Sequence, residues 1–205
     1  MTVPGRTDAA RLLLTLDPPR WFLRHSRAVA EIAAWLAART AERGTALDRR
    51  LVEAAALLHD VDKLLSDADP ASGLPHGEGS AAWLAARGLP ELEPAVANHP
   101  VTRLADGDRF RRWQSSAGRE AQIVAYADKR AGQRLQSMAA RFAAWERRFP
   151  PGGDGWPAAM RSAILARADR LEEAVCRAAG VRPEDVRRLP WTGTALARAQ
   201  EHQTP

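Results

Sequence analysis

The sequence is poor in the residues that build disulfides, sheets and membrane spans. Cys176 is its one cysteine, which excludes an internal disulfide and a thiolate metal cluster and suits a reducing compartment. Aromatic residues make up 6 % of the chain and tyrosine occurs once, whereas alanine, the best helix former, is abundant. No apolar run approaches the roughly 20 residues that span a bilayer, and the first residues lack a signal-peptide pattern. We therefore expect an all-α, cytoplasmic protein without a membrane partner.

Lysine is also scarce, although the chain is basic. Lys plus Arg total 30 against 25 for Asp plus Glu, which gives a formal net charge of +5. This balance permits a nucleotide, phosphate or nucleic-acid partner without choosing among them. Only Lys63 and Lys129 are lysines, and each follows an acid, in "HDVDK" and "YADK". This placement suggests that these two positions need a compact ammonium group.

A proline- and glycine-rich break in the chain predicts one main domain with a C-terminal extension. Residues 1–149 form the main domain, "PPGGDGWP" at 150–157 is a linker, and 158–205 form a C-terminal helical extension. An amphipathic helix is expected over 157–179, and the residues after Pro190 are expected to be loose.

Within the main domain, apolar spacing predicts a helical bundle. Helices are expected over 6–16, 21–43, 80–87 and 92–99, and a further helix begins after Asp48 as its N-cap. Residues 100–118 are expected to form a long basic loop. From about Arg119 a single long helix is expected to carry an apolar stripe as far as Phe149.

The stretch "ALLHDVDKLL" places polar residues inside an apolar helical run. Buried polar groups cost free energy unless they are paired, and a metal ion is one efficient partner. Asp60 and Asp128 are the acids beside such apolar stripes. Four of the five histidines stand at helix ends or in loops beside them: His25, His59, His76 and His99. Imidazole and carboxylate ligands suit Mn, Fe, Zn, Ni or Co, and their wide spacing requires tertiary packing to bring them together.

The order of His25, the pair His59-Asp60 and the distant Asp128 resembles the HD-domain superfamily of metal-dependent phosphohydrolases. The resemblance spans roughly residues 20–148. It implies an all-helical HD-domain bundle in which these four residues bind one metal ion. It further implies that Asp60 bridges to a second ion where one exists.

The flanking motifs extend this resemblance. "LLHDVDK" is similar to the family's "HDIGK" signature, with Asp62 in place of glycine, and the match implies that Lys63 faces the substrate phosphate. His76 in "HGEGSAAWL" and His99 in "ANHP" are similar to the two-metal bacterial type that includes symmetrical dinucleoside tetraphosphate hydrolases. That likeness implies a second metal ion held by His76 and His99, with Asp60 as the bridge.

The resemblance predicts a phosphohydrolase that cleaves a phosphoester or phosphoanhydride of a nucleotide-type substrate with metal-activated water. Two divalent ions in one site activate water and clamp a phosphoryl oxygen. Lys63, Lys129 and Arg130 are the candidates to neutralise phosphate charge. Asp62 or Glu78 is the candidate proton shuttle, and Asp60 and Lys63 complete the catalytic set.

Two other functions stay open on the sequence alone. A nuclease or phosphodiesterase is suggested by the net charge and by the basic segment 103–112, beside which Trp113 could stack on a base. A non-catalytic sensor would use the same pocket to bind a nucleotide. The last helix and the aromatic end of the long one form either a dimer surface or a contact with each other.

Overall fold

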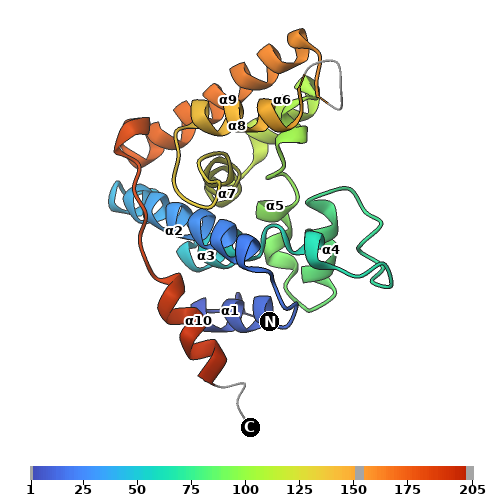
Figure 1. Ribbon diagram of the computed structural model, residues 1–205. Helices are drawn as coiled ribbons and strands as arrows, with labels where there is room; N and C mark the ends of the chain where they lie inside the picture. Colours follow the sequence, from blue (N-terminus) through green and yellow to red (C-terminus); the bar gives the residue numbers. More distant parts are fainter. Residues whose placement is uncertain (1, 151–154, 202–205) are drawn as a thin grey trace.

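Residues 2–150 and 155–201, which this computed structural model describes, fold into helices without a β-strand (Figure 1). The expectation of an all-α bundle is confirmed. The α-helices are α1 (Arg6–Leu14), α2 (Arg20–Glu42), α3 (Arg49–Leu58), α4 (Glu78–Ala85), α5 (Glu93–Val96), α6 (Gly107–Ser116), α7 (Arg119–Lys129), α8 (Met138–Arg148), α9 (Ala158–Ala179) and α10 (Thr192–Glu201). The 3₁₀ turns are η1 (Val61–Leu64), η2 (Pro90–Leu92), η3 (Val101–Leu104) and η4 (Pro183–Asp185). No helix in the described part of the chain is long and apolar enough to cross a membrane.

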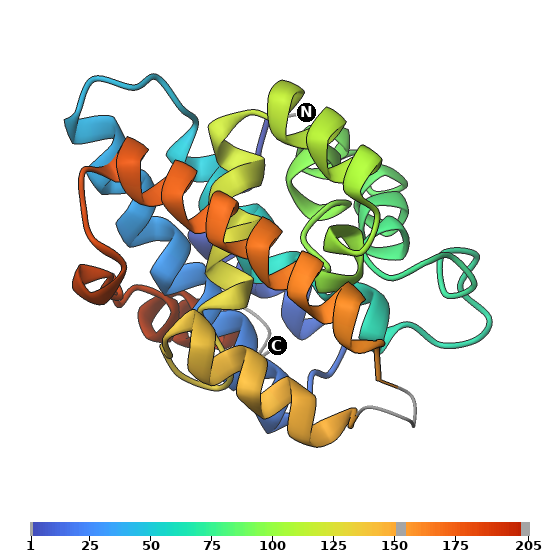
Figure 2. The same ribbon diagram turned by 90° about the horizontal axis from the view of Figure 1, so that it is seen from above.

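Helices α2, α3 and α7 form the centre of the bundle and pack on one another. The predicted stripe of α2 is buried in this core, including Val29, Ile32 and Leu36. Tyr126 of α7 is also fully buried, between this core and α9. Figure 2 shows α9 crossing over α7 and α2, against which it packs. Because alanines fill many core positions, the helices approach closely and hold the residues at their ends in fixed places.

Helix α3 is set by its cap and delivers the two residues that follow it. The Asp48 side chain accepts hydrogen bonds from the backbone N–H groups of Arg50 and Leu51, which confirms the predicted N-cap. The helix ends at Leu58, so His59 and Asp60 lie directly after its last turn. The pair is therefore placed by a helix end rather than a helix face.

The prediction of a basic loop over residues 100–118 is wrong. This segment contains η3 and α6, and the side chain of Asp106 caps α6 by accepting from the N–H groups of Asp108 and Arg109. Phe110 is 2 % exposed and Trp113 packs beside it. The many charges of this segment led to the prediction of a loop. The helix is stabilised by the packing of Phe110 and Trp113 on one face, because tertiary packing outweighs weak local helix propensity.

The long helix predicted from Arg119 to Phe149 is in fact two helices. Helix α7 ends at Lys129 and α8 begins at Met138, with Ser137 accepting from the N–H of Ala140 as its cap. A turn links them, held by an antiparallel bridge between Ala131 and Leu135. Leu135 falls at helical spacing although it lies in this turn, so the apolar pattern runs across the break.

The C-terminal part packs on the bundle. Helix α9 matches the predicted segment, whereas the prediction of a loose tail after Pro190 is wrong, because α10 packs along α1 (Figure 1). The buried Glu31 anchors this part by accepting from Arg188, at 2.5 Å to Nη2, and from the Thr192 hydroxyl. Within the predicted linker, residues 151–154 lie outside the described part.

Candidate metal centre

The six predicted metal ligands come together at one place in the bundle. His25 lies near the start of α2, and His59 and Asp60 follow α3. The other three arrive from separate elements: His76 before α4, His99 after α5 and Asp128 in the last turn of α7. Helix ends therefore aim ligands from distant parts of the sequence at a common centre.

Four of these residues form the first group of facing donor atoms. His25 Nε2 lies 3.3 Å from His59 Nε2 and 3.4 Å from Asp128 Oδ1. Asp60 closes the group, with its Oδ2 3.5 Å from His25 Nε2 and its Oδ1 3.5 Å from His59 Nε2. His59 and Asp60 are 0 % and 1 % exposed, so this group is buried.

Asp60 also belongs to a second group, with the remaining two histidines. Its Oδ1 lies 3.1 Å from His99 Nε2 and 3.4 Å from His76 Nε2. The two imidazole nitrogens are 3.3 Å apart. Asp60 is thus the carboxylate that faces both groups.

The spacing of these atoms fits divalent metal ions. Donors held tetrahedrally at about 2.0–2.2 Å from one ion lie about 3.3–3.6 Å from one another, close to the distances in both groups. Combinations of residues in the cluster that could hold an ion are His25 with His59 and Asp128, His59 with Asp60 and His99, and Asp60 with Asp62 and His76. The donor set contains nitrogen and oxygen only, which suits transition metals of borderline hardness.

Backbone carbonyls fix the orientation and the tautomer of three of the histidine rings. Nδ1 of His25 donates to Gly132 O at 2.8 Å, that of His59 to Ala56 O at 2.9 Å, and that of His99 to Val96 O at 2.6 Å. Because a carbonyl only accepts, each Nδ1 carries the proton, and in the neutral ring Nε2 presents its lone pair. Facing lone pairs repel each other unless a cation lies between them, so the residues present fit a metal ion.

The pKa values in the cluster follow from burial and from these close contacts. Burial lowers the pKa of His59 to about 3, which keeps the ring neutral at neutral pH. Burial works against ionisation of Asp60, but its histidine neighbours and Lys63 hold the pKa of that carboxyl well below its usual range. Burial alone would lower the pKa of His25, yet Asp128 and Asp60 raise it to about 9. Neutral imidazole and ionised carboxylate are the forms that bind metals, and a cation competes with the proton on His25.

Asp62, predicted as part of the catalytic set, lies behind His76. Its carboxylate accepts from His76 Nδ1 at 2.9 Å and from the Gly77 N–H at 2.6 Å. Gly77 has a φ of 85°, and a Cβ there would meet Pro100 at 2.8 Å, so this turn requires glycine. A carboxylate bonded to the far nitrogen of a ligand histidine orients that ring. Glu78, the other candidate shuttle, pairs instead with Arg103 at 2.6 Å.

Of the three cations predicted to bind phosphate, Lys63 lies beside the cluster. Its Nζ is 2.6 Å from Asp60 Oδ2, and the side chain is 42 % exposed. Lys129 is 3 % exposed, and its Nζ donates to His99 O at 2.6 Å and to Ala125 O at 3.0 Å. Its ammonium therefore supports the backbone behind the cluster.

Arg130 points away from the cluster. Its guanidinium donates to Gln136 O at 2.8 Å, to Pro183 O at 2.9 Å and to the Tyr126 hydroxyl. It ties the turn before α8 and the segment after α9 to α7. This placement does not support the predicted role of Arg130 in binding substrate.

A cavity of about 510 Å³ opens beside the cluster. His25, His76, Asp128 and Lys63 contribute to its wall, so three of the six proposed ligands are accessible from it. The opposite wall was not predicted as part of the site. It consists largely of aromatic and basic side chains from α8 and from residues between α8 and α9: Arg141, Phe142, Trp145, Arg148, Phe149 and Trp156. The spacing of residues 141, 145 and 148 places them on one helical face, which is the sequence signal that could have identified this wall.

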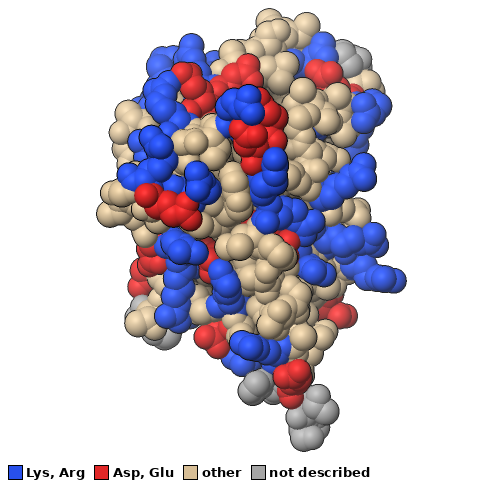
Figure 3. All heavy atoms as spheres, turned by 90° about the vertical axis from the view of Figure 1, so that its left-hand side faces the viewer, with Lys and Arg blue, Asp and Glu red and all other residues tan. Residues whose placement is uncertain are grey.

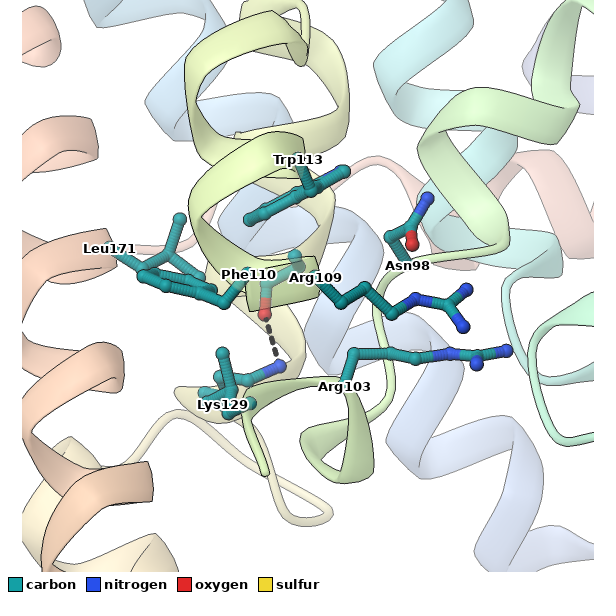
Figure 4. Close-up of a pocket in the computed structure, with 9 residues that line it drawn as sticks. Asn98, Arg103, Arg109, Phe110, Trp113, Lys129 and Leu171 are labelled. Atoms are coloured by element: carbon teal, nitrogen blue, oxygen red, sulfur yellow. Dashed lines mark hydrogen bonds between the residues drawn. The ribbon is translucent and has the colours of Figure 1, made fainter. Parts of the chain in front are cut away.

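Two arginines of the basic segment, Arg103 and Arg109, line a second, much smaller cavity of about 10 Å³, room for about one water molecule. Figure 4 shows Arg103 and Arg109 extended side by side, and both bond to Glu78. The same view shows Lys129 bonded to the Ala125 carbonyl. Trp113 is partly buried here and packs beside Phe110. On the face in Figure 3, acidic side chains and residues without charge lie among the basic ones.

The described residues thus form an all-α bundle whose histidine–aspartate cluster could hold a metal ion. The family model of the HD domain matches residues 22–133, more than half of the chain, and the protein belongs to this family. HD-domain proteins are generally metal-dependent hydrolases, and the cluster is compatible with that activity. Comparison with curated proteins and with solved structures gives no match.

Proposed function

We propose that the protein is a metal-dependent phosphohydrolase that cleaves a phosphoester or phosphoanhydride of a nucleotide-type substrate. The observation that carries the proposal is the opening of the histidine–aspartate cluster into a cavity with cationic and aromatic walls. A phosphate group binds next to the cluster and the neighbouring cations, whereas a nucleotide base packs on a flat apolar surface.

The proposed centre holds two divalent ions. His25, His59, Asp60 and Asp128 would hold one, and Asp60, His76 and His99 the other, with Asp60 shared. When bound, such ions lower the pKa of a water molecule and polarise a phosphoryl oxygen. The donors permit Fe, Mn, Zn, Ni or Co.

The chain's own residues supply orientation, charge and a partly closed site. The carbonyl-bonded imidazoles keep their Nε2 atoms directed at the centre. Lys63 places a positive charge at the cavity wall, where it stabilises negative charge that develops on the phosphate. On the opposite wall, Trp145 and Trp156 lie with their ring centroids 4.3 Å apart and offer the base an aromatic surface.

The test is phosphate release from a nucleotide panel by protein stripped of metal and reloaded with Mn²⁺. We expect metal-dependent release by the wild type and a loss of at least about a hundredfold in Asp60→Asn, whose carboxylate faces both groups. Asp169→Asn is the matched control, since that acid is exposed on α9 and does not line the cavity. Thermal melts establish that both variants fold. Tight nucleotide binding without product in every metal-loaded sample would overturn the proposal and favour the sensor.

A further inference from the structure

We infer that the substrate carries a chain of two or more linked phosphates, which α8 binds along its length through Arg141 and Arg148. This inference rests on the proposed function and names the substrate class within it: a nucleoside polyphosphate rather than a nucleoside monophosphate. It comes from the unbalanced positive charge on one wall of the cavity.

Arg141 holds the end of this wall nearest the cluster. Its Nε donates to Ala131 O at 2.8 Å, and the next carbonyl along the chain, Gly132 O, accepts from the ligand His25. The side chains of Arg141 and His25 are therefore held by the carbonyl groups of two adjacent residues. The guanidinium has five N–H donors, of which this bond uses one, so the others are available to an anion in the cavity that it lines.

Arg148 extends the positive charge away from the cluster. It lies seven residues after Arg141 on the same face of α8, about 10 Å farther along the helix axis. Within the described residues no acidic side chain pairs with it, and its guanidinium lies over the Phe149 ring at 5.4 Å. Between the two arginines stands Trp145.

The charges of the cavity wall match an extended anion. Among the described residues that line it, the cations are Lys63, Lys129, Arg141 and Arg148 and the one carboxylate is Asp128; the Lys129 ammonium is already committed to backbone carbonyls. A phosphate at the cluster lies close to Arg141, whereas Arg148 is two helical turns away. Linked phosphates repeat their negative charge over such a length, and each can accept paired hydrogen bonds from an arginine. The base then lies beside the phosphate chain, against the paired rings of Trp145 and Trp156.

The experiment compares Arg148→Gln with Arg147→Gln, its matched control. Arg147 is the adjacent arginine of α8, is exposed, and does not line the cavity. The substrates are adenosine mono-, di- and triphosphate, assayed for KM and kcat with Mn²⁺-loaded protein. Calorimetry on metal-free protein measures the Kd of a non-hydrolysable triphosphate analogue and of inorganic triphosphate.

We expect Arg148→Gln to raise the KM and Kd for triphosphates about tenfold, with kcat and the monophosphate KM nearly unchanged. Arg147→Gln is expected to behave as the wild type. Arg141→Gln, checked by thermal melting because its Nε also supports the turn, is expected to weaken mono- and triphosphate alike.

The two proposals fail in different ways. Equal kinetics of the wild type and Arg148→Gln on all three nucleotides would overturn the polyphosphate site while leaving the hydrolase in place. A preference of the wild type for the monophosphate would do the same. Absence of turnover on every substrate, with triphosphate binding still dependent on Arg148, would instead overturn the hydrolase and support the polyphosphate site.

Discussion

Replacing Asp62 separates two roles that the same carboxylate could have. If it shuttles protons, its loss lowers kcat and leaves metal binding intact. If it orients His76, as its 2.9 Å contact with Nδ1 indicates, its loss weakens the metal centre first. We predict the second result for both Asp62→Asn and Asp62→Ala.

The structure sets the expected size of each effect. Asp62 Oδ2 accepts from both His76 Nδ1 and Gly77 N–H, and Oδ1 lies 3.1 Å from the same Nδ1. The amide oxygen of asparagine can keep both Oδ2 bonds, so this variant loses the charge and the longer Oδ1 contact. Alanine loses both bonds. Removal of a carboxylate behind a ligand histidine typically costs 10–100-fold in metal affinity. We therefore expect about tenfold for Asp62→Asn and about a hundredfold for Asp62→Ala, or about 1.4 and 2.7 kcal/mol.

The assay is competition for Mn²⁺ against a chromogenic chelator, with His76→Ala as the reference for complete loss of that ligand. Thermal melts of the metal-free variants show whether the turn at Gly77 still forms. Wild-type metal affinity in Asp62→Ala, together with a reduced kcat and a shifted pH profile, would refute the orienting role and restore Asp62 as a proton shuttle.

Two further predictions concern the frame around the centre. Glu31→Ala is expected to lower the free energy of unfolding by about 3 kcal/mol in urea, because it strands Arg188 and Thr192; the cost is at the low end for a broken buried pair, since Arg188 stays partly exposed. The exposed Glu42→Ala should change little, and equal effects would contradict the anchoring role. Burial lowers the pKa of Lys129 from 10.5 to about 8, so the unfolded chain binds more protons between these values and the Lys129 contribution to stability rises with pH there. Urea unfolding from pH 8 to 10 should show a smaller upward slope in Lys129→Met, and an unchanged slope would contradict this.

The sequence was sufficient to predict which residues meet at the centre, because the ability of each residue to bind a metal ion depends on its own side chain. His25, His59, Asp60 and Asp128 combine ligand side chains with positions beside apolar stripes, and a bundle whose core buries those stripes brings them together. The resemblance to the HD family supplied their order. His76 needed that resemblance more than the others, since a histidine in a polar loop has no periodic pattern around it.

The direction of neighbouring side chains could not be predicted in the same way. Asp128, Lys129 and Arg130 are consecutive, but successive residues of a helix point about 100° apart. Asp128 faces the centre, Lys129 turns to the His99 carbonyl, and Arg130 crosses to Pro183. Only the packing of α7 among its neighbours decides which of the three meets the cavity.

The helices α6 and α10, which were not predicted from the sequence, depend on tertiary contacts. Helix α6 is polar apart from Phe110 and Trp113, and α10 is short, so neither has strong local support. Their apolar residues become informative only with α9 and α1 in place. The break at 130–137 matters most for function, because it turns α8 so that Arg141 and Trp145 line the cavity.

Metal content per chain shows whether the histidine–aspartate cluster holds two ions. Wild-type and His76→Ala protein, stripped of metal, reloaded with Mn²⁺ and passed through a desalting column, would be compared by elemental analysis. We predict about two ions per wild-type chain and about one in the variant, with both proteins folded. A folded wild type that retains no metal would contradict it, since the facing imidazoles would then have some other purpose than holding an ion.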